Sequence, residues 1–194
     1  MTPAEYLAFE RAAEERHEYN NGEVYAMTGE GWEHSVINNN LIGEVHRQIK
    51  GGPNQGYAPN LKVGIGPGTA FFYPDLMVTY GRPVTHGDDV LLNPGVIFEV
   101  VSPATEARDR GEKFHRYQEL ESLTDYVLIS QSQPWIEHFA RREDQRWLCF
   151  PYIGLSASLY IKSLNCHVSL ADIYEQVEFP PEETEPDSDN PEGA

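Results

Sequence analysis

Three charged residues in the middle of the sequence, Asp75, Glu99 and Lys113, have the chemistry to hold a metal ion and act on a phosphate. Asp75 stands at the start of one apolar run, Glu99 lies inside a second, and Lys113 follows just beyond it. Two carboxylates on neighbouring strand ends can hold a hard divalent cation such as Mg²⁺ or Mn²⁺ through oxygen ligands. A nearby ammonium group can stabilise a charged phosphate or position an attacking water. This is the residue set that a magnesium-dependent phosphodiesterase requires.

Each of these residues also has an ordinary structural interpretation. Pro74 removes a backbone donor, which places Asp75 at the beginning of a strand, where its carboxylate could instead cap a turn in solvent. Glu99 interrupts a run hydrophobic enough for a central strand, yet it could face water on an open sheet face or pair with an interior Arg or Lys. Lys113 is expected on a helix, where a lysine is ordinarily solvated. All three alternatives stay open at this point.

The elements that must position these residues follow from the spacing of apolar side chains. Thr2-Pro3 predicts the start of a short helix, and apolar residues recur every three or four positions over 32–50, the clearest helix in the chain. Runs broken by Gly, Pro and Asn predict strands. These are 23–27, 57–66, 71–81, 95–102, 125–130, 135–141 and 146–152, with a third helix over 107–123. The order indicates an α+β (α/β-like) fold in which helices flank a mixed central sheet.

Length and composition indicate one globular domain over residues 1–177 and an acidic, Pro-rich tail over residues 178–194. The tail has seven carboxylates and no Lys or Arg, so we expect it to be disordered and to lie outside the fold. Neither Cys149 nor Cys166 has metal-ligand spacing, and no signal peptide or long apolar stretch is present. We therefore expect a reduced, cytoplasmic protein that does not contact a membrane.

The net charge of −17 argues against tight, nonspecific nucleic-acid binding, because that affinity comes from cations that displace counterions along the phosphate backbone. It does not exclude a nuclease. A carboxylate-rich site becomes compatible with a phosphate once a cation is bound. A local basic cluster could serve where the overall charge does not, and its members are Arg108, Arg110, Lys113 and Arg116.

Several short motifs, taken with the order of elements, carry a family resemblance. They are Pro74-Asp75, Glu99-Val100-Val101-Ser102-Pro103, Arg108-Asp109-Arg110-Gly111-Glu112-Lys113, an opening His17-Glu18-Tyr19-Asn20-Asn21-Gly22-Glu23 and a closing Leu170-Ala171-Asp172-Ile173-Tyr174. Together they resemble the restriction-endonuclease-like (Uma) family, a branch of the PD-(D/E)XK nuclease superfamily. The resemblance covers most of the chain, from Tyr6 to Tyr174.

The resemblance implies a restriction-endonuclease-like core and a metal-dependent endonuclease activity on nucleic acid, DNA in particular. Asp75 and Glu99 would be the metal ligands, with Glu18, expected on the first helix, as a third carboxylate of the catalytic set. The superfamily pattern places a lysine two residues after the second acid, where this sequence has Val101. The resemblance suggests that the lysine has moved onto the helix as Lys113, whose long side chain could reach the same space.

Two other functions also fit the sequence. A non-catalytic binding or assembly module could keep the nuclease fold without its chemistry, which Val101 and the acidic surface favour. A metal-dependent hydrolase of a small phosphorylated compound would suit the acidic body better than a DNA-binding groove does.

Two further features of the sequence each have two interpretations. His34 opens the longest helix, where it could face the site, although we favour an ordinary helix residue. A late aromatic group could form a homodimer interface suited to cutting both strands of a duplex, although interior packing is the favoured interpretation. Its members are Trp135, Phe139, Trp147, Phe150 and Tyr152.

Overall fold

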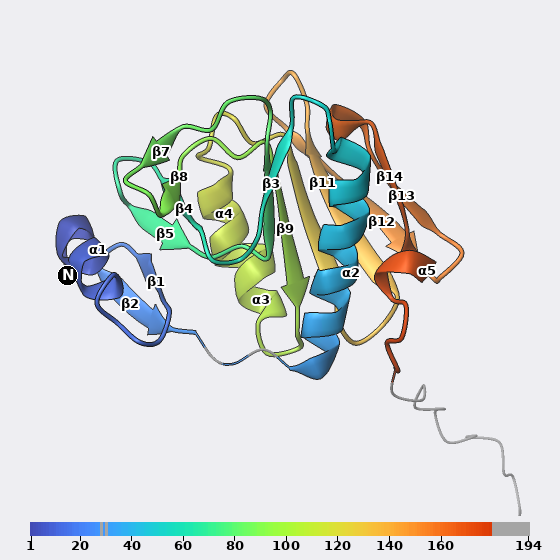
Figure 1. Ribbon diagram of the computed structural model, residues 1–194, viewed down its shortest axis with the longest axis horizontal. Coiled ribbons are helices and arrows are strands. Elements are labelled where there is room, and N and C mark those ends of the chain that lie inside the picture. Colours follow the sequence, from blue (N-terminus) through green and yellow to red (C-terminus); the bar gives the residue numbers. More distant parts are fainter. Residues whose placement is uncertain (28, 30, 180–194) are drawn as a thin grey trace, which may run out of the picture.

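The computed structural model describes residues 1–27, 29 and 31–179 (Figure 1), so residues 180–194 of the predicted tail lie outside the described residues. The helices are α1 (Pro3–Glu10), α2 (Trp32–Ile49), α3 (Glu106–Arg108), α4 (Phe114–Tyr117) and α5 (Leu170–Ile173), with a π-helical turn η1 (Asp109–Lys113) and a 3-10 turn η2 (Lys162–Leu164). The strands are β1 (His17–Asn20), β2 (Glu23–Ala26), β3 (Gln55–Tyr57), β4 (Lys62–Ile65), β5 (Ala70–Phe72), β6 (Leu76–Thr79), β7 (Thr85–His86), β8 (Val90–Leu91), β9 (Val96–Val101), β10 (Asp125–Ser130), β11 (Trp135–Arg141), β12 (Trp147–Ile153), β13 (Ser158–Ile161) and β14 (Cys166–Ser169). Within the described ranges, no helix combines the length and the apolar composition that crossing a bilayer requires.

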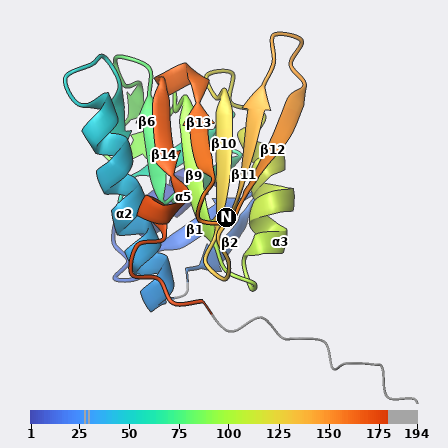
Figure 2. The same cartoon turned by 90° about the vertical axis from the view of Figure 1, so that its right-hand side faces the viewer.

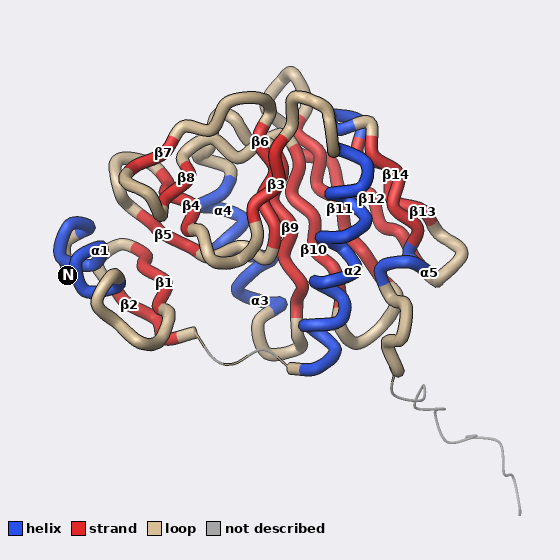
Figure 3. Tube along the Cα trace, in the orientation of Figure 1, coloured by secondary structure: helices blue, strands red, loops and turns tan. Residues whose placement is uncertain are grey.

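A six-stranded mixed sheet forms the centre of the molecule, in the order β12-β11-β10-β9-β6-β3 (Figure 3). β9 pairs in parallel with β10 and antiparallel with β6. Every residue of β9 is buried, as expected for a strand that is covered on both faces. The predicted α+β fold with a mixed central sheet is confirmed.

The helix α2 packs along one face of this sheet (Figure 1). Its apolar residues recur at helical spacing, and Ile37, Leu41, Val45 and Ile49 are all buried. They share one hydrophobic core with strands of the central sheet and with the β13–β14 hairpin, which lies beside α2 in Figure 2. The helix predicted over 32–50 is confirmed.

A second sheet lies beside the central one, in the order β2-β1-β5-β4-β8-β7. It occupies the left side of Figure 1 together with α1. β5 belongs to this second sheet and β6 to the central sheet, so residues 73–75 carry the chain from one sheet to the other. Asp75 therefore lies at the boundary between the two sheets.

Glu18 lies on strand β1, so the prediction that it comes from the first helix was wrong. α1 ends at Glu10, and β1 and β2 form an antiparallel hairpin. The turn of the hairpin is Asn21-Gly22, with φ angles of 49° and 95°, which Asn and Gly tolerate best. The turn was recognisable from the sequence, whereas the strand before it is too short and too polar to show a two-residue period.

The late aromatic residues divide between the interior and the surface. Phe139 and Trp147 pack against a second hydrophobic core, to which strands of both sheets and α4 contribute. Phe150, on the edge strand β12, is 44 % exposed. A homodimer stays a prediction.

Leu41→Ala should lower the free energy of unfolding by about 2–5 kcal/mol, because it leaves a cavity under the centre of α2. Leu41 is fully buried. Urea denaturation measures the change. Leu148→Ala is a matched control on the surface of β12, where Leu148 is 40 % exposed, and it should cost under about 1 kcal/mol. An equal decrease in the free energy of unfolding in the two variants would contradict the packing of α2 against the sheet.

Candidate active site

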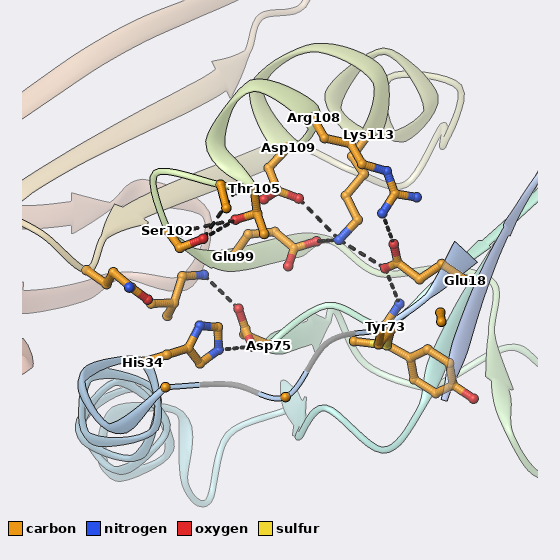
Figure 4. Close-up of a pocket in the computed structure, with 17 residues that line it drawn as sticks. Glu18, His34, Tyr73, Asp75, Glu99, Ser102, Thr105, Arg108, Asp109 and Lys113 are labelled. Carbon is orange, nitrogen blue, oxygen red and sulfur yellow. Dashed lines mark hydrogen bonds and ion pairs between the residues drawn. The ribbon is translucent and has the colours of Figure 1, made fainter. Parts of the chain in front are cut away.

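A cavity of about 380 Å³ lies between the two sheets and the helical segment 106–117, and all four predicted site residues line it. Glu18 comes from β1, Asp75 from the residue before β6, Glu99 from β9 and Lys113 from η1. Figure 4 shows their side chains directed toward one another. The other polar side chains of the lining include His34, Ser102, Thr105, Arg108 and Asp109. The structure thus brings together residues that are distant along the chain.

Asp75 is held from two sides. Its side chain is buried, so it does not cap a turn in solvent. The Val100 N–H of β9 donates to Oδ2 at 2.7 Å, and Nε2 of His34 on α2 lies 2.9 Å from Oδ1. These contacts fix the carboxylate at the mouth of an apolar strand, where an unpaired charge would be costly.

Glu99 is buried within β9 and does not face water. Its Oε1 accepts hydrogen bonds from the Lys113 ammonium at 3.1 Å and from the Tyr117 hydroxyl at 2.7 Å. The second oxygen is directed into the cavity, on the side of Asp75 (Figure 4). Burial raises the pKa of Glu99 to about 8; Lys113 opposes the rise and the neighbouring carboxylates add to it.

The ammonium group of Lys113 lies among three carboxylates and is buried rather than solvated. Its Nζ is 3.0 Å from Glu18 Oε1, 3.1 Å from Glu99 Oε1 and 3.2 Å from Asp109 Oδ1. Burial alone would lower the pKa of Lys113, but the three carboxylates raise it well above its ordinary value. Lys113 is therefore a fixed positive charge at neutral pH.

Two of the charged side chains in this cluster, Asp109 and Lys113, lie on one π-helical turn. The turn stands between α3 and α4, and both Asp109 and Lys113 are buried. Such turns are frequent at functional sites. Asp109, Lys113 and Tyr117 are spaced four residues apart, the spacing that places side chains near one another on a helix. That signal was present in the sequence and could have identified Asp109 and Tyr117, although neither was predicted.

Glu18 pairs with both cations of the cavity. Its Oε1 contacts Lys113 and accepts the Tyr73 N–H at 3.2 Å, while its Oε2 accepts from Arg108 Nη1 at 2.7 Å. Glu18 is 2 % exposed. With cations on both oxygens, Glu18 orients Lys113 and Arg108 in the cavity.

Only part of the predicted basic cluster reaches this cavity. Lys113 and Arg108 line it. Arg110 and Arg116 are absent from the lining and instead pair with acidic side chains elsewhere. The positive charge near the candidate metal ligands therefore comes from two side chains rather than four.

The charges of the cavity suit one divalent cation. Its lining carries four acidic side chains and, besides His34, two basic ones, which when all six are ionised leave a formal excess of two negative charges. Among the described residues, no group of three or more His, Cys, Asp or Glu side chains is arranged to hold a metal ion by itself. Mg²⁺ is usually held by one or two carboxylates, with waters and substrate oxygens completing its shell. Asp75 and Glu99 fit a cation of that kind.

Comparison with known proteins places the chain in a family. A family model described as "Putative restriction endonuclease" (Uma2) matches residues 3–186. The chain belongs to the Uma2 family. The relationship predicted from the short motifs is therefore confirmed.

Relatives of this Uma2 protein extend over nearly its whole length. "Uncharacterized protein slr1290" of Synechocystis is 33 % identical over 179 residues, which cover 92 % of this chain and 94 % of the relative. "Uncharacterized protein sll1609" of the same organism is 29 % identical over 161 residues, 82 % of this chain and 91 % of the relative. A crystal structure of "a putative nuclease belonging to DUF820" from Anabaena variabilis has a TM-score of 0.74 at 16 % identity, covering 90 % of this chain and 97 % of that chain. This chain and the Anabaena protein therefore share a fold.

Glu99→Gln should raise the free energy of unfolding in metal-free buffer, and more so at higher pH. The pKa of Glu99 is raised on folding from 4.5 to about 8, so the folded protein binds its proton more tightly than the unfolded chain does. Ionisation of Glu99 therefore destabilises the fold as the pH rises through this range. One pKa unit corresponds to about 1.4 kcal/mol, so we expect a gain of a few kcal/mol at pH 8 and almost none at pH 4.

Urea denaturation in EDTA at these two pH values measures the gain. Glu121→Gln, at an exposed glutamate of the same region, is the matched control and should give no pH-dependent gain. Equal stability of the parent and Glu99→Gln at pH 8 would show that Glu99 is not a destabilising buried charge.

Proposed function

We propose that this Uma2 protein is a Mg²⁺-dependent endonuclease that hydrolyses phosphodiester bonds of nucleic acid, with DNA as its substrate. The observation that carries the proposal is the convergence of Asp75, Glu99 and Lys113 in one acidic cavity. The description of the matching family as a restriction endonuclease supports nucleic acid as the substrate. The description of the Anabaena protein as a nuclease supports it further.

Asp75 and Glu99 would hold the metal ion. Lys113 and Tyr117 occupy Oε1 of Glu99, which leaves the oxygen that faces the cavity for the cation. When bound, Mg²⁺ supplies positive charge that polarises the phosphate and lowers the pKa of a bound water. Mn²⁺ also suits carboxylate and water ligands and should substitute for it.

Lys113 would stabilise the negative charge that the phosphate gains in the transition state. Its raised pKa keeps the side chain protonated, so Lys113 can donate hydrogen bonds to the phosphate or to water but cannot accept a proton. A donor that is already fixed in place stabilises such a transition state by roughly 3–4 kcal/mol. Val101, at the usual lysine position of the superfamily, is buried among apolar side chains and cannot supply this charge.

Asp75→Ala, Glu99→Ala and Lys113→Ala should each slow Mg²⁺-dependent cleavage of plasmid DNA by about two to three orders of magnitude. The two acidic variants should also lose Mg²⁺ affinity in isothermal titration calorimetry, because each removes a proposed ligand. Lys113→Ala should still bind Mg²⁺, at least as tightly as the parent, because Lys113 is not a ligand and its loss makes the cavity more negative. Asp88→Ala and Lys162→Ala, at exposed residues outside the cavity lining, are the matched controls and should cleave at the parent's rate.

The same experiments separate the proposal from its alternatives. Unchanged cleavage in all three cavity variants would eliminate the site assignment. A parent that binds neither Mg²⁺ nor Mn²⁺ at millimolar concentration would favour a binding or assembly module. Cleavage of bis(p-nitrophenyl) phosphate, without cleavage of plasmid DNA or of RNA, would favour a hydrolase of small phosphorylated compounds.

A further inference from the structure

His34 is a polar residue of the cavity to which the proposed chemistry gives no role. It lies in the first turn of α2 and points toward Asp75 (Figure 4). Its Nε2 is 2.9 Å from Asp75 Oδ1, and its side chain is 12 % exposed. The sequence favoured an ordinary residue at the start of a helix, whereas the structure places His34 against a candidate metal ligand.

The helix beneath His34 is fixed to the central sheet. Ile37, Leu41 and Val45 follow on the same face at helical spacing, and all three are fully or almost fully buried. A side chain carried by a packed helix is held more precisely than one carried by a loop. His34 therefore offers Asp75 a nitrogen whose position is set by the core of the protein.

Asp75 needs this second contact to have a defined orientation. The backbone of Val100 holds only Oδ2. A carboxylate that binds a metal ion can only accept hydrogen bonds, so in the proposed metal site Nε2 of His34 would carry the proton and donate a hydrogen bond to Oδ1. Donors on both oxygens stop the carboxylate from rotating about its Cβ–Cγ bond. With Val100 alone, Oδ1 would be free to turn away from the cavity.

We propose that His34 is a positioning residue of the metal site, which orients Asp75 through Nε2. The inference rests on the proposed function, in which Asp75 is a metal ligand. Loss of a residue that orients a metal ligand typically lowers metal affinity or activity about 10- to 100-fold. A role in stability alone would leave the Mg²⁺ affinity of the folded protein unchanged.

Two substitutions at this position separate the contact from the fold. The side-chain amide nitrogen of glutamine can reach the place of Nε2, whereas that of asparagine corresponds to Nδ1. We expect His34→Ala and His34→Asn to bind Mg²⁺ about 10- to 100-fold more weakly than the parent, and His34→Gln to stay within about threefold of it. Isothermal titration calorimetry of the full-length proteins with MgCl₂ measures the affinity. His46→Ala, at an exposed histidine of the same helix, should bind like the parent.

Cleavage kinetics provide a second readout. Weak metal binding should raise the Mg²⁺ concentration needed for half-maximal cleavage in His34→Ala, while the rate at saturating Mg²⁺ should recover toward that of the parent. Thermal unfolding in EDTA reports any loss of stability separately. If His34→Ala does not fold, the comparison of His34→Gln with His34→Asn decides the question.

The outcomes distinguish this inference from the proposed function. Parent-like Mg²⁺ affinity in His34→Ala, or equal affinity in His34→Asn and His34→Gln, would overturn the positioning role and leave the endonuclease proposal standing. A parent that binds no Mg²⁺ would overturn both. Weak binding in His34→Ala and His34→Asn with rescue in His34→Gln would establish that the Nε2 contact orients the site.

Discussion

The buried ammonium group of Lys113 contacts carboxylates from three parts of the chain. Its carboxylate partners are Glu18 of the second sheet, Glu99 of the central sheet and Asp109 of the same π-helical turn. A charge inside a protein is tolerated only where such partners compensate it. The same group therefore links the helical turn to both sheets and, with Arg108, supplies the positive charge of the cavity, so one interaction serves both the packing and the site.

The cavity nevertheless contains more acidic than basic side chains, and burying this excess lowers the stability of the fold. Glu99 shows it most directly, because its pKa is raised to about 8 chiefly by burial. A sequence selected only for stability would replace such a residue with an apolar one, as buried ion pairs often can be. Its presence inside β9, where every residue is buried, is explained by the proposed cation site, since functional sites commonly lower the stability of the proteins that contain them.

The residues that were predictable from the sequence are those that break a local pattern. Asp75 opens one apolar run and Glu99 interrupts another, and the period of α2 and of the central strands is regular enough to assign their type. Contacts between distant segments have no such local signal. Glu18 and Arg108 meet across 90 positions, and the strand that carries Glu18 has only four residues. The π-helical turn and the contact of His34 with Asp75 likewise depend on tertiary packing, which spacing alone does not encode.

In the proposed mechanism, Lys113 takes the part of the lysine that the superfamily pattern places within the strand. The residue two places after Glu99 is Val101, which belongs to the hydrophobic core, so a lysine there would have to bury its charge among apolar side chains. A lysine on the neighbouring helical turn can place its ammonium 3.1 Å from the same carboxylate while the strand keeps an apolar core residue. Electrostatic stabilisation depends on where the charge lies in space. A search that requires the lysine within the strand motif would therefore miss this chain, although its cavity contains the same set of groups.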